Sequence, residues 1–66
     1  MTHLEAIEEA RSGFRQAIMM SVQHNDRIGY YCMMAHYRSV NSAITDLGGE
    51  SCEPPDLERF LEDGDA

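Results

Sequence analysis

The spacing of apolar residues in the middle of the chain constrains the fold most. They recur at alternating intervals of three and four positions: Tyr30, Met33, Tyr37, Val40, Ile44 and Leu47. This spacing places the side chains along one side of an α-helix, in the seam pattern of a helix that packs against another helix. Gly48 and Gly49 follow directly, and glycine often ends a helix because it adopts the left-handed conformation without strain. The sequence therefore predicts one helix that ends near residue 47.

The first third of the chain predicts another amphipathic helix. Thr2 and Glu5 form a capping-box pair, in which each side chain can bond the backbone amide of the other residue. Apolar residues then recur at spacings of three and four up to about Gln23: Leu4, Ile7, Ala10, Phe14, Ala17, Ile18 and Val22. Asn25 or Asp26 can cap a following helix, so a tight turn is predicted at residues 24–26, with one continuous kinked helix as the alternative.

These patterns predict an all-α fold, an antiparallel helix-turn-helix hairpin over residues 1–49. A chain of 66 residues supports one small core, and two helices alone do not enclose one. The side of the second helix opposite its seam is also nearly free of charge: Ile28, Cys32, Ala35, Ser39 and Ser42. We therefore expect two hairpins to form a homodimer, a four-helix bundle that buries the bulky seam. The arrangement resembles Rop-type helical hairpins in its pattern of helices.

Residues 50–66 predict an acidic tail. The net charge of the chain is −7 and residues 1–45 sum to zero, so the acidic excess follows the second helix. A Pro-Pro pair excludes a continuing helix and favours an extended spacer, after which Asp56 can cap a short helical turn. The apolar residues of that turn lie at positions i, i+3 and i+4: Leu57, Phe60 and Leu61. They are predicted either to fold back on the hairpin as a lid or to anchor in the groove of a partner.

The residues that could carry chemistry form incomplete sets. Cys32 and His36 lie one helical turn apart, where two side chains can hold one metal ion, but a structural zinc site needs two further ligands. Asp46 lies ten residues beyond His36, too far along the helix to complete a Cys-His-Asp triad. No glycine-rich phosphate loop and no paired-carboxylate motif occurs. The sequence therefore predicts a protein that is not an enzyme and holds no metal and no cofactor.

Charge and hydropathy exclude several classes of partner. Direct binding to nucleic acid needs a basic stripe, whereas this chain contains no lysine and its first 45 residues are neutral. No apolar run approaches the roughly 18 residues of a membrane span, and the N-terminus lacks the residue order of a signal peptide. We therefore expect a cytoplasmic protein that neither binds nucleic acid directly nor enters a membrane.

Methionine and tyrosine indicate a contact surface, because both residue types are enriched where proteins bind one another. Filling of an irregular core is the alternative. The predicted protein-binding residues are Met19, Met20, Tyr30, Tyr31, Met33, Met34 and Tyr37, together with Leu57, Phe60 and Leu61 of the tail. We predict a small regulator that binds a larger protein, of the inhibitor or anti-activator type that phages and plasmids encode. The other candidates are an acidic mimic of nucleic acid that blocks a basic groove, and a small structural subunit of an assembly.

Overall fold

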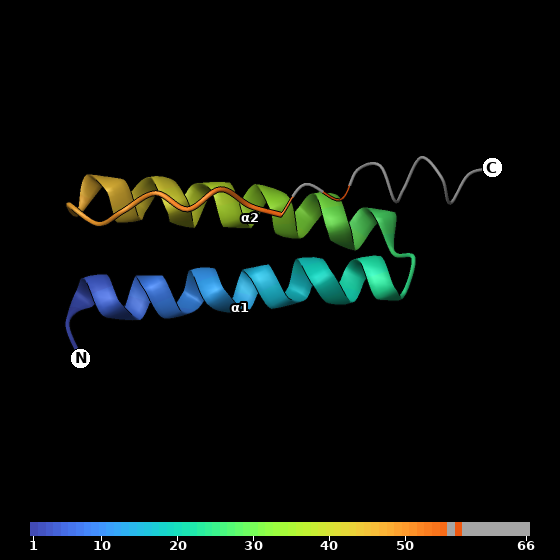
Figure 1. Cartoon of the computed structure of the whole chain (residues 1–66), viewed down its shortest axis with the longest axis horizontal. Helices are drawn as coiled ribbons and strands as arrows, with labels where there is room; N and C mark the ends of the chain where they lie inside the picture. The colour runs from blue at the N-terminus through green and yellow to red at the C-terminus, as the bar shows by residue number, and fades with distance from the viewer. Residues whose placement is uncertain (56, 58–66) are drawn as a thin grey trace.

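Two antiparallel helices form the body of the protein, α1 (His3–Gln23) and α2 (Arg27–Asp46). The computed structural model describes residues 1–55 and 57, and this part of the chain contains no strand. The helices pack side by side along their length (Figure 1). The all-α hairpin is therefore confirmed, and the kinked single helix is excluded. Within the same residues, no helix is long and apolar enough to cross a membrane.

Local hydrogen bonds fix where both helices begin. Thr2 Oγ1 accepts from the amide of Glu5 at 3.1 Å, and Glu5 Oε1 accepts from the amide of Thr2 at 3.0 Å, which completes the predicted capping box. The bond from the Thr2 amide to the Glu5 carboxylate, followed by the Thr2 side chain, lowers the pKa of Glu5. At α2 the cap is Asp26, whose Oδ1 accepts from the amide of Gly29 at 2.9 Å. Asn25 instead takes the left-handed conformation of the turn, with φ of 54°.

Two glycines follow the end of α2, where the sequence predicted that the helix would stop, and the chain reverses there (Figure 1). Gly48 has φ of 88°, and the amide of Gly49 donates to the carbonyl of Ile44 at 2.8 Å. A Cβ at Gly49 would lie 2.6 Å from Ile44 Cγ2 and 2.9 Å from Leu4 Cδ1, so the close approach of the chain to the helices requires glycine. Residues 48–55 and 57, which we name the return segment, then run back along α2 (Figure 1).

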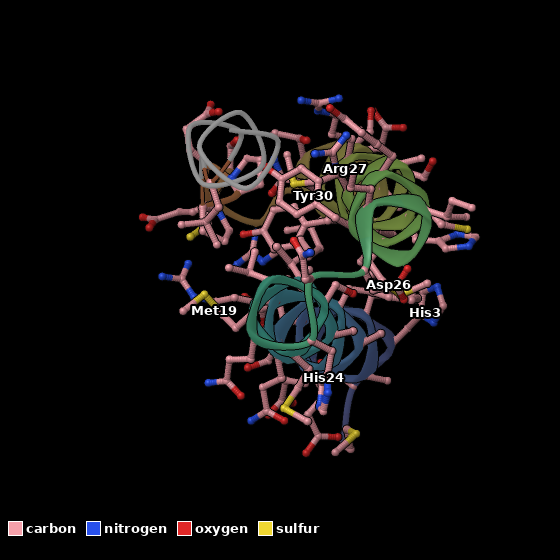
Figure 2. The ribbon with its side chains drawn as sticks, turned by 90° about the vertical axis from the view of Figure 1, so that its right-hand side faces the viewer. His3, Met19, His24, Asp26, Arg27 and Tyr30 are labelled. Carbon is pink, nitrogen blue, oxygen red and sulfur yellow. The ribbon has the colours of Figure 1, made fainter. Side chains whose placement is uncertain are left out.

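The core lies between α1, α2 and the return segment. Its buried side chains come from both helices: Ile18, Tyr30, Met34, Tyr37 and Ile44. All of these except Ile44 form one core cluster, and partly buried side chains pack against it from all three elements: Phe14, Val22, Met33 and Leu57. Figure 2 shows Tyr30 on the side of α2 that faces the return segment. Most of the bulky seam of α2 is thus covered within one chain, by α1 and by the segment that follows the helix, while Leu47 at its end stays exposed.

The predicted tail is described only in part. Leu57 packs against the core cluster, in the position that a lid on the hairpin would give it. Phe60, Leu61 and the predicted helical turn that includes them lie outside the described residues.

Candidate protein-binding surface

The structure places the predicted tyrosine and methionine contact residues in two different environments. Tyr30, Met34 and Tyr37 are buried in the core, and Met33 packs against them while half-buried. The others are exposed: Met19, Met20 and Tyr31. The seven residues therefore do not form one continuous exposed surface.

Four exposed apolar side chains lie on the two helices near the loop that joins them. We name Met19, Met20, Ile28 and Tyr31 the loop-end patch; they lie in the last turns of α1 and the first turns of α2. Ile28 is 84% exposed and Tyr31 is 54% exposed. The ring of Tyr31 meets the buried ring of Tyr30 edge to face, with centroids 5.3 Å apart, so the core fixes its position. The buried Tyr30 ring thus limits the positions that the exposed Tyr31 ring can take.

Sequence reasoning left Ile28 out of the predicted binding residues, although it is the most exposed of the four. The sequence did contain a signal, because Ile28 is the one large residue on the charge-poor side of the second helix. A large aliphatic residue on a side that the seam does not use has no place in the core of the same hairpin.

A shallow hollow on α1 adjoins the methionines of the loop-end patch. It has a volume of about 420 Å³ and is lined by Ser12, Arg15, Gln16, Met19 and Met20. Figure 2 shows Met19 extending from α1 away from α2. Flexible thioethers beside a hollow allow a surface to adapt to the side chain of a partner.

The side of α2 opposite its seam is exposed and carries small side chains. We name Cys32, Ala35, Ser39 and Ser42 the outer stripe; each is exposed, and none is charged. The four recur at spacings of three and four, which is the pattern of a helix-packing seam. Small residues at such positions allow two helix backbones to approach closely.

The paired cysteine and histidine of α2 form a weak surface contact. Cys32 Sγ lies 4.0 Å from His36 Nε2, and the His36 ring stacks on Phe14 with centroids 5.4 Å apart. No group of three or more His, Cys, Asp or Glu residues that could hold a metal ion occurs in the part of the chain that the structure describes. Cys32 and Cys52 are both free and exposed.

Tyr37 links the core to the return segment. Its hydroxyl donates to the carbonyl of Cys52 at 2.8 Å, and its ring is only 1% exposed. Burial, followed by the neighbouring Cys52 side chain, raises the pKa of this hydroxyl, and the nearby guanidinium groups of Arg11 and Arg15 oppose the shift. The hydroxyl therefore stays protonated at neutral pH, and it remains a hydrogen-bond donor.

No protein-family model, no curated protein and no solved structure matches this chain. The function is therefore argued from the surface of the hairpin.

Proposed function

We propose that this protein is a small regulator, of the inhibitor or anti-activator type, that binds a larger protein through its loop-end patch. The observation that carries the proposal is the exposure of Ile28 and Tyr31, at 84% and 54%, beside Met19 and Met20 at the same end of the hairpin. Ile28 and Tyr31 lie three residues apart on α2, so their side chains are neighbours on the helix surface, and adjoining exposed apolar residues are more typical of a contact site than isolated ones. Aromatic residues and methionine are also the types that interfaces favour.

Affinity capture with matched variants tests the proposal. The full chain serves as bait in three forms: unchanged, with Ile28→Gln and Tyr31→Ser together, and with Leu47→Gln as the control. Leu47 is also a large exposed apolar residue, but it lies at the opposite end of α2. We expect a partner that the unchanged and control baits retain and the double variant loses.

Salt concentration separates this function from mimicry of nucleic acid. An apolar contact should persist as salt is raised, whereas the grip of carboxylates on a basic groove should weaken steeply. A partner that the double variant retains, or that salt alone releases, would contradict binding through the loop-end patch.

We further propose that the protein is a homodimer, with the outer stripe as the contact between copies. The four-helix bundle expected from the sequence used the bulky seam of α2, but Tyr30 and Tyr37 of that seam are buried within the single chain. The outer stripe is the other side of α2 with helix-packing spacing, and its small residues suit close contact. Sedimentation of the reduced full chain over a wide concentration range tests this. Ala35→Glu should yield a monomer, and a dimer that survives this change would rule out the outer stripe.

A further inference from the structure

Side chains of the hairpin hold the return segment mainly through hydrogen bonds to the main chain of that segment. Two of these hydrogen bonds are accepted by carbonyl groups. Arg11 Nη1, from α1, donates to the carbonyl of Glu50 at 2.8 Å. Tyr37 Oη, from α2, donates to the carbonyl of Cys52 at 2.8 Å. Neither bond depends on which side chain the segment carries at that position.

Two more bonds satisfy amide groups of the segment. Asn41 Oδ1 accepts from the amide of Cys52 at 3.0 Å, and Tyr30 Oη accepts from the amide of Leu57 at 3.1 Å. The order of these contacts shows that the segment runs antiparallel to α2, as Figure 1 also shows. The hairpin therefore presents donors and acceptors along a groove that fits an extended main chain.

The side chains of the segment add few apolar contacts. Residues 50–53 are exposed, and the half-buried residues of the described segment are Gly49, Pro54, Pro55 and Leu57. Leu57 is the anchor, because it packs against the core cluster. Consecutive prolines favour the extended polyproline II conformation, which reduces the entropy lost when such a segment binds.

Charge also matches between the groove and the segment. A hollow of about 170 Å³ beside the segment is lined on α1 by two arginines and one glutamate: Arg11, Arg15 and Glu8. The segment carries Glu50 and Glu53 and no basic residue between positions 48 and 57. The groove therefore suits an acidic peptide better than a basic one.

We propose that this groove is a recognition site for an extended acidic peptide with a Pro-Pro pair and a large aliphatic residue two positions later, and that the return segment is its internal occupant. The partner is a segment of another protein with this pattern. It binds when it displaces the return segment, through the same bonds from Arg11, Tyr30, Tyr37 and Asn41. This site is separate from the loop-end patch and does not depend on the function proposed for it.

The tethered segment competes with any free peptide, and its effective concentration is on the order of millimolar. Loosening the segment should therefore raise the affinity for a free peptide, because the competent state becomes more populated. Substitutions in the groove should lower the affinity. Opposite changes in peptide affinity for the two kinds of variant distinguish a groove that can bind a free peptide from one that the return segment fills permanently.

The probe is a fluorescent peptide with the sequence of residues 48–57, GGESCEPPDL, titrated into the reduced full chain and followed by anisotropy. Two variants loosen the segment: Leu57→Ser, which removes the anchor, and Pro54→Gly with Pro55→Gly, which leaves the core cluster untouched. We expect each to bind the peptide at least about fivefold more tightly than the unchanged chain does. A peptide with both prolines replaced by glycine is the matched control and should bind more weakly.

Groove variants complete the test. Adding Tyr37→Phe or Asn41→Ala to either loosened chain should weaken peptide binding about fivefold, as expected for the loss of one main-chain hydrogen bond. Circular dichroism confirms that each variant keeps its helices. Absence of peptide binding by both loosened chains, or equal binding with and without Tyr37→Phe, would overturn the proposal.

Discussion

Asn41→Ala should loosen the return segment from the helices. The Asn41 Oδ1 accepts from Arg11 Nη1 at 2.8 Å and from the amide of Cys52 at 3.0 Å, and its Nδ2 donates to Ser51 Oγ at 3.0 Å. Three hydrogen bonds at about 0.5–1.5 kcal/mol each would sum to roughly 1.5–4.5 kcal/mol. Because Ser51 and Cys52 are exposed, hydrogen bonds to water replace part of this free energy in the variant. The lower half of the range, about 2 kcal/mol, therefore applies.

Helix propensity acts in the opposite direction. Alanine is better than asparagine inside a helix by about 0.5 kcal/mol, which leaves a net loss of about 1.5 kcal/mol. For a domain of this size the loss corresponds to a fall in Tm of roughly 6–12 °C.

Thermal unfolding followed by circular dichroism measures the effect. Ser42→Ala is the control, because Ser42 is the next residue of α2, is exposed, and gains helix propensity in the same way. We expect Ser42→Ala to leave the Tm unchanged or to raise it slightly, and Asn41→Ala to lower it without loss of helical signal at low temperature. If the two variants had the same Tm, Asn41 would not hold the return segment to the hairpin.

Four further substitutions test the fold. Gly13→Ala should raise the Tm, because the added Cβ would meet nothing within 4 Å and alanine favours a helix over glycine by about 1 kcal/mol. Gly49→Ala should lower the Tm, because the added Cβ would lie 2.6 Å from Ile44 Cγ2. Equal shifts in Tm for the two variants would contradict this contrast. Burial raises the pKa of Tyr37, so the stability that depends on its neutral phenol is lost as the pH rises above about 10. Tyr37→Phe has no such group, and its unfolding free energy should therefore fall less over the same pH range. Urea titrations below and above that pH measure the change in unfolding free energy of each chain. An equal change in the unchanged chain and in Tyr37→Phe would refute the prediction. Thr2→Ala should cost about 1 kcal/mol in the same titration at neutral pH, because it removes the cap of α1, and no change would show that the cap is replaced by water.

Local signals explain why the hairpin was predictable. The capping box at Thr2 and the left-handed Gly48 act within a few residues, so they can be recognised in a sequence without knowledge of the tertiary structure. Which residue would cap α2 was not decided by such signals, because Asn25 and Asp26 both suit the position. The structure resolves the choice through the left-handed φ of Asn25 and the bond from Gly29 to Asp26.

The path of the return segment was not predictable in the same way. It is held by bonds to main-chain atoms, and main-chain atoms are the same for every sequence. The Pro-Pro pair indicated extended chain, and the spacing of Leu57 allowed a lid, but neither signal gave the groove that receives the chain. For the same reason, the apolar spacing could not show whether the seam of α2 would be covered by a second copy or by the chain itself.

The tyrosines of the seam explain why the chain covers its own core. Tyr30 and Tyr37 are each 1% exposed and occupy positions that leucine commonly fills in helix pairs, so their hydroxyls need partners inside the packed layer. The return segment supplies them, as an amide at Leu57 and a carbonyl at Cys52. The apolar seam of a second copy would leave both hydroxyls without partners, at about 1–3 kcal/mol each. A molecule that displaces the return segment must therefore supply partners for both hydroxyls, as an extended main chain does, and a dimer that kept this core would use a surface other than the seam of α2.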